Sequence, residues 1–303
     1  MTASDRQRKP ARVLVTGARG LLGTPTTAMF RQDEGVEVLA VDLPELDITD
    51  ESSVARQFKA FNPDLVINCA AYTQVDGCEQ NEALARRVNG LGAGIVAVAA
   101  AVCGARMIHI STDYVFEGDA KSPYTEDQPP GRLGKLSAYG RSKLIGEQLV
   151  QLCHSESLIV RTAWLYGPDG PGFPAAILRK AREEGRLRVV NDQTGSPTYA
   201  PDLAAALYKL ARLSVSGIVH VTNSGQCTWY EFAREIVRLT GLDVPVEPVT
   251  TAEFPRLAKR PAYSVLANRR FDEAVGSPLR HWREAAAEYV SRHVLPRAGG
   301  ASV

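Results

Sequence analysis

The chain has 303 residues, with 35 Lys and Arg against 34 Asp and Glu, so its formal net charge is only +1. A chain this close to neutrality lacks the broad basic field that holds a protein on nucleic acid or on an anionic membrane, and we expect neither as a partner. The length fits one large domain, or one core domain with a smaller domain appended.

The cysteines and the amino terminus indicate the cellular compartment. Five cysteines are scattered along the chain without a CxxC pair, which argues against a disulfide framework or a zinc site. The polar segment Met1–Arg12 is not followed by the apolar stretch of a signal peptide, and no later run approaches the ~20 apolar residues of a membrane span. We therefore expect a cytoplasmic protein with reduced thiols.

Short apolar runs alternate with helical patterns through the first half of the chain. Strands are expected at 13–15, 36–41, 65–70, 106–111 and 157–162, and long helices at 83–102 and 138–152. Because parallel strands need crossover connections, this rhythm predicts an α/β fold with a doubly wound parallel sheet of the Rossmann type.

After Trp164 the pattern loosens into Pro- and Gly-rich segments, with helices expected at 175–184, 203–212 and 229–240. This half is expected to form a smaller C-terminal substrate-binding domain over the carboxyl edge of the sheet. The predicted division is a dinucleotide-binding domain at 10–162 with a return segment near 198–222, a substrate-binding domain at 163–197 and 223–296, and tails at 1–9 and 297–303.

A glycine cluster, Thr16 to Gly23, follows the first expected strand and opens a helix. Its three glycines, Gly17, Gly20 and Gly23, have the spacing GxxGxxG. Glycine lets the backbone approach a pyrophosphate, and the helix amino terminus supplies free N–H groups. An ordinary strand-to-helix turn is the alternative, but the strand before, the helix after and an acid at the next strand end favour a dinucleotide site.

Two residues favour different cofactors, so either NAD or NADP is expected. Asp42 ends the second strand, where a carboxylate accepts hydrogen bonds from the ribose hydroxyls of NAD, whereas Arg19 in the glycine loop suits the 2′-phosphate of NADP. Asp47 and Ile48 lie where a loop meets the adenine, although Asp47 also suits a helix cap. Ala71, Tyr72 and Thr73 follow the strand that would run beneath the cofactor, and plain sheet core is the alternative there.

Tyr139 and Lys143 are four residues apart and hence share one face of a helix. A neighbouring cation is expected to lower the pKa of the phenol, which then protonates a ketone oxygen as hydride arrives. Ser111 and Thr112 close a predicted parallel strand, and a hydroxyl there can stabilise the developing alkoxide. A surface helix pair and a strand-end cap are the structural alternatives.

These residues resemble the extended short-chain reductases and, within them, the dTDP-4-dehydrorhamnose reductase family. The glycine loop and YxxxK occur throughout the superfamily, whereas STDYVF at 111–116 and DQTGSPT at 192–198 are much narrower. The other similar stretches lie at 68–76, 161–166 and 260–264, and the likeness extends from Val13 to about Trp282.

The resemblance implies a role for each matching residue. The implied catalytic residues are Thr112, Tyr139 and Lys143, with Lys143 also holding the nicotinamide ribose. With the glycine-loop residues included, the cofactor contacts are Gly17, Arg19, Gly20, Leu21, Leu22, Gly23, Asp42, Asp47, Ile48, Ala71, Tyr72, Thr73, Tyr139 and Lys143. The implied substrate contacts are Thr112, Asp113, Tyr114 and Trp164, although Trp164 suits a core aromatic equally well.

The resemblance also implies the reaction, in which NADPH or NADH reduces the C4 ketone of dTDP-4-dehydro-6-deoxy-L-mannose to give dTDP-L-rhamnose. A ketoreductase for another nucleotide deoxysugar, a non-catalytic regulatory subunit of methionine adenosyltransferase and an epimerase or dehydratase remain alternatives. Some members hold magnesium through a glutamate after the glycine loop, but this chain has Thr24 and Pro25 there, so no metal is expected. A homodimer is left open.

Overall fold

The computed structural model describes residues 10–295, so the expected tails at 1–9 and 297–303 lie outside the described residues. A six-stranded sheet with the order β10-β5-β4-β3-β1-β2 forms its centre, and every pair of neighbouring strands is parallel. The strands are β1 (Arg12–Thr16), β2 (Glu37–Val41), β3 (Leu65–Asn68), β4 (Arg106–Thr112), β5 (Leu158–Thr162) and β10 (Gly217–His220). The predicted Rossmann-type parallel sheet is confirmed.

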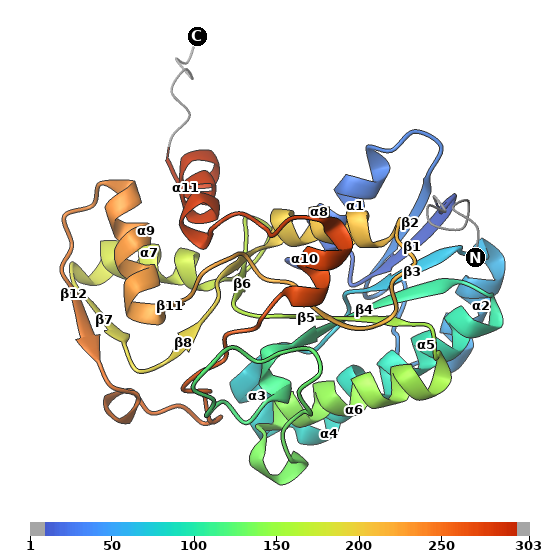
Figure 1. Cartoon of the computed structure of the whole chain (residues 1–303), viewed down its shortest axis with the longest axis horizontal. Helices are drawn as coiled ribbons and strands as arrows, with labels where there is room; N and C mark the ends of the chain where they lie inside the picture. Colours follow the sequence, from blue (N-terminus) through green and yellow to red (C-terminus); the bar gives the residue numbers. More distant parts are fainter. Residues whose placement is uncertain (1–9, 296–303) are drawn as a thin grey trace.

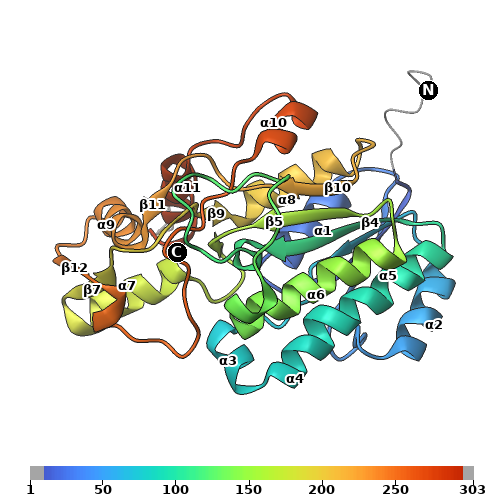
Figure 2. The ribbon, with the colours of Figure 1, turned by 60° about the horizontal axis from the view of Figure 1, so that its bottom comes forward.

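Helices cover both faces of the sheet, as the almost wholly apolar strands require (Figure 1). On one face, α1 (Gly23–Arg31) and α8 (Ala200–Leu210) pack on residues such as Val15 and Ile67. On the other, α2 (Glu51–Phe61), α5 (Ala93–Val102) and α6 (Ala138–Cys153) pack on residues such as Val66 and Met107. Figure 2 shows these three helices side by side.

The helix expected at 83–102 consists of α4 (Glu82–Ala85), a π-helical stretch (Arg86–Gly92) and α5. Among the described helices, Glu82–Val102 is long and apolar enough, by length and composition only, to cross a membrane. This differs from the expectation that no segment approaches a membrane span. Half of its apolar window is buried, and Val96, Ala97 and Ala100 pack in the sheet core. It is therefore a core helix of the α/β fold.

Most of the second half of the chain forms another unit beside the sheet (Figure 1). Its core surrounds Tyr166, Phe232 and Trp282. The elements of this unit are β6 (Leu165–Tyr166) with β9 (Thr198–Tyr199), β7 (Leu187–Val190) with β12 (Val246–Val249), β8 (Thr194–Gly195) with β11 (Cys227–Thr228), and the helices α7 (Phe173–Glu184), α9 (Trp229–Thr240) and α11 (Trp282–His293).

Short helices complete the fold: α3 (Val75–Gln80) and α10 (Arg269–Val275), with 3-10 turns at Asp113–Val115, Leu133–Lys135 and Thr251–Glu253. The helix α9 begins at Thr228 with a capping box, in which the Thr228 hydroxyl accepts from the Glu231 N–H and the Glu231 carboxylate accepts from the Thr228 N–H. This cap holds Trp229 at the first position of the helix, next to the carboxyl edge of the sheet.

Candidate active site

A cavity of about 420 Å³ lies at the carboxyl edge of the sheet, and we call it the central cavity. It brings together the glycine loop after β1, the segment after β3, the end of β4 and the start of α6. Because parallel strands end at the same edge, distant sequence segments converge here. The predicted site residues that line it are Gly17, Gly20, Leu21, Leu22, Gly23, Ala71, Thr73, Thr112, Asp113, Tyr114, Tyr139, Lys143 and Trp164.

The glycine loop is packed against the neighbouring strand end. Gly17 has φ +63°, and a Cβ atom there would lie 2.6 Å from the Ala70 nitrogen. A Cβ atom on Gly23 would lie 2.0 Å from the Gly17 oxygen. Larger residues would therefore displace the loop from β3 and fill the cradle, which fits a pyrophosphate bound close to backbone N–H groups.

Arg19 and Asp42 contact each other rather than line the central cavity. The Arg19 N–H donates to Asp42 Oδ2 (2.9 Å), and the Leu43 N–H donates to Asp42 Oδ1 (2.8 Å). The Arg19 guanidinium forms an ion pair with Glu45 and donates to the Leu43 carbonyl (3.1 Å). Arg19 of the glycine loop and Asp42 thus meet at the end of β2. A cofactor phosphate at Arg19 would compete with Glu45 for the guanidinium.

Three predicted cofactor contacts have structural partners and do not line the central cavity. Asp47 Oδ1 accepts from the N–H and the hydroxyl of Thr49, both at 2.8 Å, and forms a local turn rather than a helix cap. Ile48 is buried, and a Cβ atom on Gly92 would lie 2.9 Å from its side chain. The Tyr72 N–H and carbonyl bind the buried Asn89 amide at 2.7 and 2.9 Å.

Asn89 lies in the π-helical stretch and was not singled out in the sequence. Its Nδ2 also donates to Ser142 Oγ (2.9 Å), and Ser142 Oγ donates to the Tyr139 carbonyl (2.7 Å). One buried amide therefore joins the segment after β3 to the first turns of α6.

Tyr139 and Lys143 face the cavity from α6, but Lys143 does not act as expected on the phenol. Lys143 Nζ donates to the Ile110 carbonyl (2.7 Å) and lies 3.4 Å from His109 Nε2. Burial lowers the pKa of Lys143 to about 8. Burial raises the pKa of Tyr139 above that of a free phenol, opposite to the expected shift, because desolvation of the phenolate outweighs the hydrogen bond with Thr112.

Thr112 and Asp113 form a buried hydroxyl–carboxyl pair. Thr112 Oγ1 donates to Asp113 Oδ1 (2.9 Å) and accepts from the Tyr114 N–H (3.2 Å). Burial raises the pKa of Asp113 to about 6 despite hydrogen bonds from Ser264 and Thr112. The Tyr114 ring meets the Tyr139 ring edge to face, with centroids 5.4 Å apart. Asp113 is therefore a buried carboxyl group in hydrogen-bond contact with the predicted catalytic Thr112.

Trp164 lies in the wall of the central cavity and also packs against two hydrophobic cores, so both alternatives for this residue hold. Its backbone has φ +46°, and its indole occupies the space above Gly195, where a Cβ atom would lie 2.3 Å from the ring. The ring stacks on Trp229, with centroids 3.4 Å apart. Trp229 was missed in the sequence, where it reads as the first residue of an ordinary amphipathic helix.

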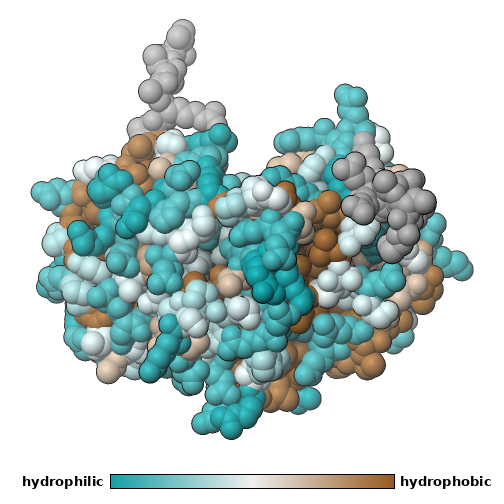
Figure 3. All heavy atoms as spheres, viewed as in Figure 1, coloured by the Kyte–Doolittle hydropathy of each residue, from teal (hydrophilic) through white to brown (hydrophobic). Residues whose placement is uncertain are grey.

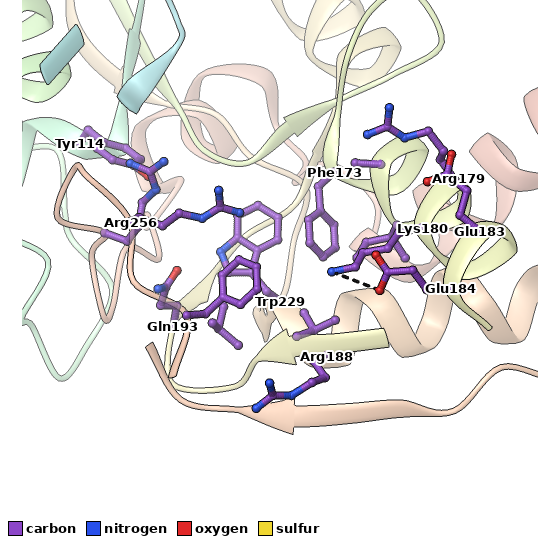
Figure 4. Close-up of a pocket in the computed structure, with 16 residues that line it drawn as sticks. Tyr114, Phe173, Arg179, Lys180, Glu183, Glu184, Arg188, Gln193, Trp229 and Arg256 are labelled. Atoms are coloured by element: carbon purple, nitrogen blue, oxygen red, sulfur yellow. Dashed lines mark ion pairs between the residues drawn. The ribbon is translucent and has the colours of Figure 1, made fainter. Parts of the chain in front are cut away.

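A second hollow of about 560 Å³, the outer cavity, shares Tyr114 and Trp229 with the central cavity. Figure 4 shows that Phe173, Trp229 and several cationic side chains surround the outer cavity. Arg260 is paired with Asp76 (2.9 Å), whereas the Arg256 guanidinium lies over the Phe254 ring at 4.8 Å. The cations that line it are Arg179, Lys180, Arg188, Arg256 and Arg260. Such a wall suits a ligand with phosphate groups and a planar ring.

The chain is similar to known sugar-nucleotide reductases over most of its length. The dTDP-4-dehydrorhamnose reductase of Mycobacterium tuberculosis (strain CDC 1551 / Oshkosh) is 46% identical over 283 residues, 91% of each chain. The dTDP-4-keto-6-deoxy-D-glucose reductase of Streptomyces niveus is 39% identical over 279 residues, 91% of this chain and 96% of that one.

Among solved structures, the dTDP-4-dehydrorhamnose reductase of Bacillus anthracis in complex with NADP superposes with a TM-score of 0.88 and 39% identity, covering 93% of this chain and 99% of that one. The family model of the RmlD substrate binding domain matches residues 11–294. The chain therefore belongs to the RmlD substrate binding domain family, which is the dTDP-4-dehydrorhamnose reductase family that its motifs resemble.

Proposed function

We propose that the protein reduces the C4 ketone of dTDP-4-dehydro-6-deoxy-L-mannose to dTDP-L-rhamnose with NADPH or NADH. The observation that carries this proposal is that Thr112, Tyr139 and Lys143 line the same cavity as the glycine loop. Relatives with this reductase name cover nearly the whole chain.

The cradle formed by Gly17, Gly20 and Gly23 would hold the cofactor pyrophosphate, with Leu21, Leu22, Ala71 and Thr73 along the same cavity. When bound, the reduced nicotinamide supplies the hydride. Lys143 would hold the nicotinamide ribose. Its ammonium group is oriented by the hydrogen bond that it donates to the Ile110 carbonyl. Arg19 and Asp42 stand at the place that distinguishes NADP from NAD.

The side chains of the active site have defined proton states. Tyr139 is a neutral phenol near pH 7, and burial, which raises its pKa, keeps the proton on it until the ketone oxygen takes it. Thr112 donates its single hydroxyl proton to Asp113 Oδ1, so towards Tyr139 its oxygen acts as an acceptor. Tyr139 is thus the proton donor, and Thr112 positions the Tyr139 hydroxyl.

The outer cavity would take the nucleoside diphosphate of the substrate. Its arginines and Lys180 suit the phosphates, and Phe173, Trp229 and Phe254 suit a planar base. Asp113, Tyr114 and Trp164 lie in the wall toward the sugar. In this proposal residues 10–162 with the return segment near 198–222 bind the cofactor, and residues 163–197 and 223–296 bind the substrate.

A second candidate function is reduction of another dTDP ketosugar, because the Streptomyces niveus relative is named for dTDP-4-keto-6-deoxy-D-glucose. The non-catalytic regulatory subunit is disfavoured, since Thr112, Tyr139 and Lys143 are all present and gathered at one cavity. A panel of dTDP ketosugars separates the two reductase functions.

The decisive experiment follows the loss of reduced-nicotinamide absorbance when purified protein is mixed with epimerised dTDP-4-keto-6-deoxyhexose, with NADPH and NADH in separate assays. Oxidation that yields dTDP-L-rhamnose supports the proposed reaction. Cofactor binding without oxidation, and turnover of another ketosugar in the panel, would move the function to the second candidate.

We also propose that the protein works in the cytoplasm, where nucleotide sugars are made, and as a homodimer. An apolar groove of about 790 Å³ lies between α2, α5 and α6, with Leu91, Val102 and Leu152 exposed beside it. Figure 3 shows apolar residues gathered over these helices. Glu51 and Lys59 line the groove from opposite ends of α2. A twofold axis at the groove would therefore place Glu51 of one copy opposite Lys59 of the other. Light scattering tests the proposed homodimer, and the molar mass of a monomer would contradict it.

A further inference from the structure

A row of buried polar side chains crosses the sheet beneath the active site. Thr16, Asn68 and His109 are register partners on β1, β3 and β4, and each is at most 1% exposed. Thr16 Oγ1 lies 2.7 Å from the Asn68 amide, and Asn68 lies 3.1 Å from His109 Nδ1. His109 Nε2 lies 3.4 Å from Lys143 Nζ, so the row ends on the ammonium group of the active site.

These polar groups stand where the fold otherwise places apolar side chains. Two residues earlier on the same strands and on the same face are Leu14, Val66 and Met107, all buried in the core under α5 and α6. Burying polar groups in such a core costs free energy unless each finds a partner. Here each member of the row has one, and the partner of His109 on the α6 side is Lys143.

The proton positions follow from the charge on Lys143. If Asn68 Nδ2 donated to His109 Nδ1, a neutral imidazole would carry its proton on Nε2 and direct it at the Lys143 ammonium, so that two donors would face each other. If the Asn68 amide presents its oxygen to His109 instead, its Nδ2 donates to Thr16 Oγ1, His109 Nδ1 carries the imidazole proton, and His109 Nε2 accepts from Lys143. Amide and imidazole orientations are chosen by such donor–acceptor matching, and a charged Lys143 requires the second.

We propose that His109 is a positioning residue for Lys143, which accepts a hydrogen bond from the ammonium group and is itself oriented by Asn68 and Thr16. Lys143 then donates one hydrogen to the Ile110 carbonyl and one to His109, and the third is left for the central cavity that Lys143 lines. This inference deepens the proposed reductase function and rests on it, because it assigns what holds Lys143 in the catalytic orientation.

The surroundings of Lys143 make this acceptor important. The charged and titratable groups that face it are Glu147 one turn along α6, Cys69 after β3, His109 on β4 and Tyr139 on α6. Glu147 is already committed to Arg161, with two hydrogen bonds of 2.7 and 2.8 Å. Burial keeps His109 neutral, since its pKa is far below the usual value. The Ile110 carbonyl and His109 are therefore the neutral acceptors that support the ammonium form.

Three substitutions of His109 separate positioning from core filling. His109→Gln can place an amide oxygen at the Nε2 position, within reach of Lys143, whereas His109→Asn reaches only the Nδ1 position and keeps the Asn68 contact. His109→Phe retains a ring of similar size without any acceptor. If His109 merely filled the core, the Gln variant would be no better than the Asn variant, and losses would follow thermal stability.

We expect His109→Asn and His109→Phe to lower kcat about 10-fold or more with the KM for the dTDP ketosugar unchanged, and His109→Gln to recover most of the rate. Activity that depends on the Lys143 ammonium is lost as pH rises through its pKa. Without the acceptor that pKa falls, so the alkaline limb of the kcat profile moves to lower pH in the Asn and Phe variants but not in the Gln variant.

A second readout uses neither cofactor nor substrate. The Lys143 side-chain carbon signals, assigned with a Lys143→Arg variant, are titrated by NMR in the ligand-free protein. We expect the midpoint to fall by about 1 pH unit in His109→Phe and to stay near wild type in His109→Gln. Wild-type kcat and an unmoved Lys143 midpoint in His109→Phe, or a Gln variant as impaired as the Phe variant, would overturn the proposal. If the wild-type protein reduces no ketosugar, the proposed function fails, while the NMR titration still decides whether His109 supports Lys143.

Discussion

Trp164 and Trp229 lie face to face, with ring centroids 3.4 Å apart and ring planes within 4° of parallel. Trp164 follows β5 of the sheet, and Trp229 is the first residue of α9 in the second unit. Both rings line the central cavity, and Trp229 also lines the outer cavity. The stacked pair therefore forms the wall where the two halves of the chain meet around the proposed substrate.

Replacing Trp229 tests this wall. Trp229→Ala removes the stacking surface, and we expect the KM for the dTDP ketosugar to rise about 5-fold, because an aromatic contact contributes about 1 kcal/mol beyond its area. The KM for NADPH should change less than twofold, since the glycine loop is untouched. Trp229→Phe serves as the control and should lie close to wild type. Equal increases in both KM values would indicate a general loss of structure.

Replacing Tyr139 tests the proton donor. Tyr139→Phe removes the hydroxyl and keeps the ring that packs on Tyr114, so kcat should fall about 100- to 10,000-fold while the dissociation constant for NADPH, measured by fluorescence, stays within about threefold. Tyr230→Phe on α9 is the matched control and should leave both quantities unchanged. Retained turnover in Tyr139→Phe would remove this phenol from the mechanism.

Asp113 links the active site to stability. Its folded pKa of about 6 exceeds the ordinary value of 3.8, so the folded protein holds this proton more tightly than the unfolded chain. The wild-type free energy of unfolding therefore declines, for this group, as pH rises from about 4 to about 6. Asp113→Asn removes this cost, which amounts to about 3 kcal/mol when fully developed.

Urea unfolding of wild type and Asp113→Asn across this range measures the effect. The Asn variant should gain stability over wild type at pH 7, and the gain should shrink toward zero near pH 4. A difference that does not depend on pH would show that the Asp113 carboxyl titrates normally in the folded protein.

Arg19 and Glu45 test cofactor choice. The Arg19 guanidinium is shared with Glu45, and this exposed ion pair is weak enough to be replaced by a phosphate. Arg19→Ala should raise the KM for NADPH about threefold more than that for NADH, because only NADPH carries a 2′-phosphate. Glu45→Gln should lower the KM for NADPH by releasing Arg19. Identical changes for the two cofactors would exclude Arg19 from phosphate recognition.

Local patterns in the sequence were sufficient for the main elements of the first half. The runs at 65–70 and 157–162 correspond to β3 and β5, and the helix expected at 138–152 corresponds to α6. The helix α2 was not anticipated, although Asp50 caps it by accepting from the Ser53 N–H. Its buried residues Val54 and Phe58 are four positions apart, the spacing of one helix face, so the cap and this pattern were local signals that could have predicted the helix.

The sequence by itself determined the glycine loop and the Tyr139–Lys143 pair, because each depends on spacing within one or two turns. It placed a hydroxyl at the strand end, and the resemblance to the family chose Thr112 over Ser111 there. The tertiary structure decided what lies around them: Trp229 is 65 residues from Trp164 along the chain, and His109 is 34 residues from Lys143. Contacts of this kind arise from register between strands and from packing of one unit on another, which no local pattern records. For the same reason the pKa of Tyr139 rises rather than falls, since burial is a property of the folded cavity.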